Sequence, residues 1–147
     1  MSNAQTARFL SALYTLGLFG TIAAGGVWLA LLLTNTPVES NGRMWLAGLF
    51  VLAVMALVIA IGARFALQRF YDSVCSAAFN AWRSNPGYDT GIDAELLADL
   101  AGLPRDHVRH ARYFLERKAR ASGITYQAGP NTPPNLRKFP FRKRMDR

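Results

Sequence analysis

Residues 9–33 read FLSALYTLGLFGTIAAGGVWLALLL, and residues 44–63 read MWLAGLFVLAVMALVIAIGA; neither stretch contains a charged side chain. As helices rising about 1.5 Å per residue, they would extend about 37 Å and 30 Å, against a hydrocarbon core of about 30 Å in a typical bilayer. The two stretches therefore predict a transmembrane hairpin. We expect the first span to be retained, because its apolar run is about twice as long as that of a secretory signal and a second span follows it.

The charges that flank the two spans predict the orientation of the hairpin. Arg8 precedes the first span, and Arg64 and Arg69 follow the second, whereas the loop at residues 34–43 has no net charge. Because positively charged flanks stay in the cytoplasm, we expect both termini to be cytoplasmic and the loop external. The predicted location is the inner membrane of a bacterium.

Small side chains recur at helical spacing within both spans, which allows close approach of two helix backbones. Two interpretations remain open: contact inside the hairpin, or association with another copy or another membrane subunit. Neither span contains a charged residue or a histidine, which argues against an ion or proton pathway within one copy. The seam residues are Gly17, Thr21, Ala24, Ala53, Ala56, Ala60 and Ala63.

The formal net charge of +8 belongs to the last third of the chain. Residues 64–100 carry three basic and five acidic side chains, whereas residues 101–147 carry twelve basic and three acidic ones. Such a block favours polyanionic partners, either nucleic acid or the anionic headgroups of the membrane lipids. Cys75 is the one cysteine, so no intrachain disulfide can form, and we expect it to be a small buried helix residue.

Residues 64–84 continue the helical pattern of the second span but become amphipathic. The Asn85-Pro86-Gly87 sequence predicts the end of this long helix. The predicted apolar face needs a cover, either from the rest of the chain or from a partner helix. The residues of that face are Phe70, Val74, Ala77, Ala78 and Ala81.

Two short helices are predicted beyond this break. Asp93 is a suitable N-cap for a helix over 94–101, and Gly102 is a suitable residue to end it. A second helix is expected over 105–121, with Gly123 closing it. The turn between the two helices is then only Gly102-Leu103-Pro104.

The spacing of Ala98, Gly102, Leu103 and Val108 resembles the helix-turn-helix of bacterial regulators. In that motif the alanine lets two helices cross closely, the glycine allows a tight turn, and the last hydrophobe fills the angle between them. The winged form of the family adds a β-hairpin, for which 124–127 and 136–139 are the candidate strands. One departure is Pro104, which stands where serine or threonine usually caps the second helix.

The resemblance implies that the exposed start of the second helix contacts DNA, with arginine reading guanine edges or binding phosphate. The alternative is that these basic side chains only solvate the helix. His107 and His110 lack a third ligand, so no metal site is predicted. The candidate DNA-binding residues are Arg105, Arg109, His110, Arg112, Arg117 and Lys118.

The C-terminal tail is expected to be irregular and to bind phosphate groups. Its cations would follow a nucleic-acid backbone while Phe139 and Phe141 stack on bases, or they would lie on lipid headgroups with the rings inserted. The candidate phosphate-binding residues of this tail are Arg137, Lys138, Arg142, Lys143 and Arg144, and Arg147 adds a sixth basic side chain.

The chain is therefore expected to be mainly α-helical, with a two-helix transmembrane hairpin, a long helix that continues into the cytoplasm, and a small helix-turn-helix-like module with a possible β-hairpin wing. The predicted segments are a tail at 1–8, spans at 9–33 and 44–63 joined by the loop at 34–43, an amphipathic helix at 64–85, the module at 86–136 and a basic tail at 137–147.

The sequence contains no glycine-rich phosphate loop, metal-ligand cluster or nucleophile–base pattern, so neither an enzyme nor a cofactor is expected. The leading hypothesis is a membrane-anchored protein whose basic module recruits DNA or an acidic protein to a membrane assembly. The first alternative is an accessory subunit of a larger membrane complex, with the module as a protein-docking surface. The second is a phage protein of the holin class. The expected partners are membrane lipids, DNA, and a membrane protein or a second copy of the chain.

Overall fold

The computed structural model describes residues 2–33, 40–85, 91–125 and 131–141, and it is mainly helical. Two long helices, α1 (Asn3–Leu33) and α2 (Ser40–Ser84), are followed by α3 (Ala94–Leu100) and α4 (Val108–Ala121). Short 3₁₀ helices span Arg105–His107 and Pro134–Leu136, and the described residues contain no β-strand. The chain forms two compact units, Arg8–Leu67 and Met1–Ala7 with Gln68–Arg147. We call the second unit the basic domain.

Helices α1 and α2 are both long and apolar enough to span a membrane. Only 6% and 11% of the residues in their most apolar stretches are buried, so neither has the enclosed surface of a soluble core helix. Large side chains such as Leu16, Phe19 and Val58 are exposed along them. A contiguous apolar surface of this kind marks contact with lipid or with protein.

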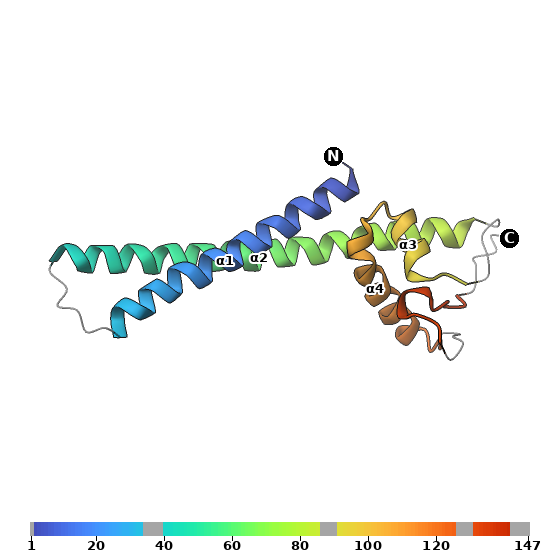
Figure 1. Ribbon diagram of the computed structural model, residues 1–147. Helices are drawn as coiled ribbons and strands as arrows, with labels where there is room; N and C mark the ends of the chain where they lie inside the picture. Colours follow the sequence, from blue (N-terminus) through green and yellow to red (C-terminus); the bar gives the residue numbers. More distant parts are fainter. Residues whose placement is uncertain (1, 34–39, 86–90, 126–130, 142–147) are drawn as a thin grey trace. The chain divides into compact units, whose positions relative to one another are not determined.

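Within the first unit, α1 and α2 run antiparallel and cross (Figure 1). Gly17 lies at the close approach, since a Cβ atom there would be 2.9 Å from the Ala60 backbone nitrogen and 3.0 Å from the Ala56 carbonyl oxygen. A Cβ at Gly20 would be 3.2 Å from that of Ala56. The two predicted seams thus meet inside the hairpin, where small residues let the backbones approach.

Larger side chains fill the hairpin nearer its loop. The Trp28 and Phe50 rings lie 5.3 Å apart between centroids, whereas a Cβ added at Gly25 or Gly48 would have no neighbour within 4 Å. The remaining seam residues include half-buried and buried positions: Thr21, Ala24 and Ala53 are half-buried, and Ala63 is buried. The predicted loop at 34–43 lies outside the described residues, except that α2 already begins at Ser40.

The apolar face predicted for residues 64–84 is wrong by one position. The buried residues of this stretch are Tyr71, Cys75, Ala78, Phe79 and Trp82, and only Ala78 belongs to the predicted face. The predicted and the observed residues both follow helical spacing. The observed residues, however, include three large aromatic side chains, Tyr71, Phe79 and Trp82. Burying a large ring removes more apolar area from water than burying an alanine, so the aromatic residues decide which side of α2 faces the core.

The core of the basic domain is built by α3, α4, the last turns of α2 and the segment 131–141. Trp82, Ile92, Leu97, Leu115 and Cys75 are its largest fully buried side chains. Ile92 and Phe139 form an isolated antiparallel bridge, with N–H···O distances of 3.1 and 2.8 Å. This bridge fastens the C-terminal segment beside the start of α3.

The strand predicted over 136–139 is wrong, because Leu136 ends a 3₁₀ helix and Phe139 pairs with Ile92. Its predicted partner at 124–127 lies partly outside the described residues, and Ile124 and Thr125 are not in a strand. The tandem Pro133-Pro134 accounts for the difference, since proline lacks the N–H that a strand ladder needs and is suited to the first turn of a helix.

The N-terminal residues are part of the basic domain and of helix α1. The Asn3 side-chain amide donates a hydrogen bond to the Ala101 carbonyl oxygen at 2.9 Å, and Ala7 is fully buried. Residues 1–8 were expected to be a simple tail, and nothing in their sequence indicates this contact.

Candidate polyanion-binding surface

The local geometry of α3 follows from its capping residues. The Asp93 carboxylate accepts a hydrogen bond from the Leu96 backbone N–H at 2.8 Å, as its predicted N-cap role requires. At the other end, Gly102 has a φ of +64°, and the Gly102 and Leu103 N–H groups bond to the Asp99 and Ala98 carbonyls. This is the Schellman arrangement, in which glycine accepts the left-handed backbone without steric cost.

The turn leads directly into α4. Pro104 is extended and makes no side-chain cap, so the chain enters a 3₁₀ turn at Arg105–His107 before α4 begins at Val108. Ala98 and Val108 are buried, as the helix-turn-helix resemblance implies for the two packing positions, and Leu103 and Ala111 are buried beside them. Gly123, with a φ of +62°, closes α4 by the same arrangement as Gly102 closes α3.

Four arginines form a stripe along one side of α4 and the turn before it. Positions 105, 109, 112 and 120 are separated by about whole helical turns, with Glu116 between the last two. We call this stripe the arginine face. Arg105 and Arg109 are exposed, and neither forms an ion pair with any carboxylate of the described residues. Both are therefore available to a partner.

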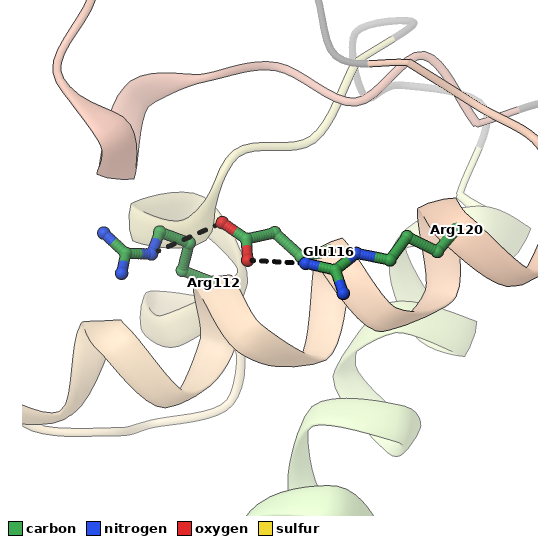
Figure 2. Close-up of polar contacts among 3 residues, drawn as sticks. All are labelled: Arg112, Glu116 and Arg120. Atoms are coloured by element: carbon green, nitrogen blue, oxygen red, sulfur yellow. Dashed lines mark ion pairs between the residues drawn. The ribbon is translucent and has the colours of Figure 1, made fainter.

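Glu116 organises the second half of the arginine face. It lies 3.6 Å from Arg112 and 4.0 Å from Arg120, and Figure 2 shows its carboxylate between the two guanidinium groups. Each pair joins residues four apart on one helix and contributes about 0.3–0.5 kcal/mol at most. The pairs hold Arg112 and Arg120 on the same face and leave the stripe with a net positive charge.

The sequence grouped Arg117 and Lys118 with the DNA-binding residues, but Arg117 contacts α2 and Lys118 lies over a ring of its own helix. The Arg117 guanidinium lies 2.7 Å from the Asp72 carboxylate of α2, and its carbon centre lies 5.9 Å from the Phe114 ring centroid. The Lys118 ammonium lies 5.8 Å from the same centroid. Both belong to the side of α4 that packs toward α2.

His110 is half-buried, whereas the sequence predicted an exposed side chain. Its ring stacks on Tyr71 of α2 with centroids 4.0 Å apart and planes inclined by 11°, and the Tyr71 hydroxyl hydrogen-bonds to His107. Burial, together with the nearby Arg109 and His107, lowers the pKa of His110 to about 4. At neutral pH the ring is therefore uncharged, and it serves to dock α4 on α2.

Burial also shifts the pKa values of two other side chains in this region, Tyr71 and Cys75. Desolvation raises the pKa of the Tyr71 hydroxyl to about 12, although the nearby Arg109 acts in the opposite direction. Cys75 is fully buried, as predicted, and desolvation raises the pKa of its thiol to about 11, with a smaller contribution from Asp72. A thiol in this state is a poor nucleophile and a poor metal ligand.

The aromatic rings of the tail have a structural role that the sequence analysis missed. Phe139 and Phe141 are 3% and 7% exposed, and Phe141 meets Phe79 edge to face at 4.9 Å. The predicted stacking of these rings on bases, or their insertion into lipid, is therefore wrong. They fill a gap in the core that the helices leave open. Lys138 is exposed and Arg137 is half-buried, while Arg142, Lys143 and Arg144 lie outside the described residues.

Nothing in the described part of the chain assembles a metal centre, since no group of three or more His, Cys, Asp or Glu side chains is suitably placed. The rings of His107 and His110 lie 6.0 Å apart and are occupied with Tyr71. Of the predicted DNA-binding residues, Arg105 and Arg109 at the start of the arginine face are exposed and make no ion pair with a described carboxylate.

The chain shows no match to any protein-family model, curated protein or solved structure with which it was compared.

Proposed function

We propose that the chain is a two-span protein of the bacterial inner membrane, and that its basic domain is a helix-turn-helix module that binds duplex DNA at the cytoplasmic face. The observation that carries the DNA-binding proposal is the arginine face, which follows a tight turn and begins with two exposed arginines, Arg105 and Arg109. Arg105 and Arg109 lie at its exposed beginning, where a helix of this motif enters the major groove.

The contact between Asn3 and Ala101 supports the membrane topology. A hydrogen bond joins residues that lie before the first span and after the second, so both must be on the same side of a membrane. Two spans satisfy this condition, and the positive charges of Arg8, Arg64 and Arg69 that flank the spans support a cytoplasmic location for that side. Both termini are cytoplasmic in this proposal.

Binding of the full chain to duplex DNA, measured in uncharged detergent over a series of salt concentrations, tests the proposal. Affinity should fall steeply with salt, because each neutralised phosphate releases counterions. Replacing Arg105 or Arg109 by alanine should weaken binding about fivefold or more, and should reduce the slope of log affinity against log salt by about one.

Arg64→Ala is the matched control, because it removes one charge outside α4 and should leave the affinity unchanged. The proposal fails if duplex DNA does not bind at low salt. It also fails if R105A and R109A bind as tightly as the unmodified chain.

An acidic protein is the second candidate partner of the same face. Tyr113 is 57% exposed beside it, and the Arg112 guanidinium lies 5.3 Å from the Tyr113 ring centroid. Exposed tyrosine next to arginine is the composition typical of residues that dominate protein–protein binding. In this case Tyr113→Ala should abolish co-purification of one defined acidic protein from mild detergent, and R64A should not.

A further inference from the structure

The basic domain contains a small cavity between α2 and α4 that the arginine face does not line. Its volume is about 220 Å³, which is below the range of about 300–1,000 Å³ typical of sites for drug-sized molecules. Residues between 68 and 72 of α2 form one wall, and residues between 110 and 117 of α4 form the other, all within the basic domain. The cavity therefore suits a compact chemical group.

The described lining residues include one cation and one anion, which face each other across the cavity walls. The Arg117 Nη2 lies 2.7 Å from the Asp72 Oδ1, and the two side chains are 60% and 44% exposed, so a ligand can reach both. His110 also lines the cavity but is uncharged at neutral pH, because its pKa is lowered to about 4. A ligand of a single charge would be attracted by one member of the ion pair and repelled by the other, whereas a zwitterion is attracted by both.

The hydrogen-bonding groups of the walls indicate which zwitterion fits. The Asp72 carboxylate and the side-chain carbonyl of Gln68 both accept hydrogen bonds, so they favour an ammonium group that carries N–H donors. The Arg117 guanidinium gives one of its five N–H donors to Asp72 and has others for a phosphate or a carboxylate. Tyr113 and Phe114 provide ring surface for a short carbon linker between the two charges.

The position of the α2 wall along the chain selects the source of such a group. Gln68 and Asp72 follow Ala63, the last residue of the charge-free stretch, by five and nine positions of the same helix. This corresponds to about 8 Å and 14 Å along the helix, whereas the headgroup layer of a bilayer is about 5–8 Å thick on each side. In the two-span arrangement proposed above, the α2 wall therefore begins at the outer edge of the headgroup layer, where phospholipids present an ammonium joined to a phosphate.

We propose that this cavity binds the headgroup of a zwitterionic phospholipid that carries a primary ammonium. The ammonium binds Asp72 and Gln68, and the phosphate binds Arg117. The assignment of the headgroup to a lipid rests on the proposed membrane location. The site does not depend on whether the arginine face binds DNA.

Native mass spectrometry of the full chain, released from uncharged detergent, tests the proposal by counting the lipids that each chain retains. Phosphatidylethanolamine, phosphatidylglycerol and phosphatidylcholine with identical acyl chains are compared. Phosphatidylethanolamine should bind at least about fivefold more tightly than either of the others. Phosphatidylglycerol lacks the ammonium, and the methylated ammonium of phosphatidylcholine has no N–H to donate.

Asp72→Asn makes the test sharper, because it removes the partner of the ammonium and leaves the charge of Arg117. It should weaken phosphatidylethanolamine binding about tenfold and strengthen phosphatidylglycerol binding, so that the lipid preference reverses. Asp99→Asn is the matched control, since it removes the same charge from an exposed position of α3 that does not line the cavity. It should leave the preference unchanged.

A half-exposed ion pair contributes little to stability, so D72N is expected to fold, and its melting temperature is measured alongside. Gln68→Leu is the second variant, because it removes one acceptor of the ammonium without altering the ion pair. It should weaken phosphatidylethanolamine binding and leave phosphatidylglycerol binding as it is.

Three results would overturn the proposal. Phosphatidylglycerol retained as strongly as phosphatidylethanolamine would show only attraction of anions to a basic domain. Equal lipid preferences in D72N and D99N would place the bound lipid elsewhere. Equal affinity for phosphatidylethanolamine and for glycerophosphoethanolamine, the same headgroup without acyl chains, would assign the cavity to a soluble compound. Since these measurements need no bilayer, they are distinct from a test of the topology, which labelling of introduced cysteines in intact cells provides.

Discussion

At the scale of single residues, the packing of His110 and Tyr71 separates two sides of α4. His110 occupies a position at which the helix-turn-helix resemblance implies contact with DNA, yet its ring lies flat against Tyr71. No local property of the sequence distinguishes contact with DNA from packing against α2, because a histidine early in a basic helix suits either role. The tyrosine that decides between them is 39 positions earlier in the chain.

The lowered pKa of His110 makes the basic domain sensitive to acid. Its pKa is about 4 in the folded chain and about 6.5 when unfolded, so the unfolded state takes up the proton first as pH falls. The contribution of the neutral ring is therefore fully present above about pH 6.5 and is lost progressively between there and about pH 4. Melting temperatures should decline over this interval.

His110→Phe is the informative variant, since it keeps a flat ring against Tyr71 but cannot titrate. Its melting temperature should be less dependent on pH between about 4 and 6.5 than that of the unmodified chain. The assignment is contradicted if the NMR titration of the His110 ring in the full chain has a midpoint near that of an exposed histidine.

At the scale of secondary-structure elements, the helix ends were the part of the fold best predicted from sequence. Asp93, Gly102 and Gly123 act through backbone groups within a few residues, and all three have the predicted positions. The predictions for the buried face of α2 and for the positions of Phe139 and Phe141 were wrong, because both features depend on contacts with distant residues. The arginine face could be predicted in part from the sequence, because its helical spacing is a local property. The positions of His110, Arg117 and Lys118 on the side of α4 toward α2 could not, because they depend on distant residues.

Replacing Asp93 by alanine should destabilise the basic domain by about 1 kcal/mol, because the Leu96 N–H loses its acceptor at the first turn of α3. Asp99→Ala is the control, as it removes the same charge from the exposed far end of that helix. Chemical unfolding in detergent, followed by tryptophan fluorescence, compares the two. Equal effects of the two substitutions would contradict the capping role.

Gly17→Ala should destabilise the hairpin by about 1–3 kcal/mol, because the new methyl group would meet the backbone of α2 rather than a side chain that can move. Gly25→Ala is its matched control in the same helix, where a Cβ has no neighbour within 4 Å. Thermal unfolding in detergent should separate the two variants. A hairpin in which G17A is as stable as G25A does not have its close approach at this position.

At the scale of the whole molecule, the chain combines an apolar hairpin with a basic domain that has its own core. The two long apolar helices were predictable, because they rest on composition over long stretches. The membership of residues 1–7 in the basic domain was not, because it depends on one amide and one buried methyl group, Asn3 and Ala7.

Labelling of introduced cysteines in intact cells checks the topology. Cys75 is fully buried and its thiol pKa is about 11, so the unmodified chain should not react with a membrane-impermeant maleimide. Thr36→Cys, in the loop between the spans, should react from outside the cell. Ser122→Cys should react only after the membrane is made permeable, and labelling of S122C in intact cells would refute the proposed orientation.

The hydrogen bond from Asn3 to Ala101 joins residues 98 positions apart, and this separation has a consequence for biosynthesis. Asn3 leaves the ribosome early, but its acceptor is made only after the two apolar helices have been synthesised. The first turn of α1 must therefore wait, without its final partner, until both long apolar helices have been synthesised. Completion of the basic domain then becomes a late step in the maturation of the nascent chain, and in the two-span protein that we propose it follows integration into the membrane.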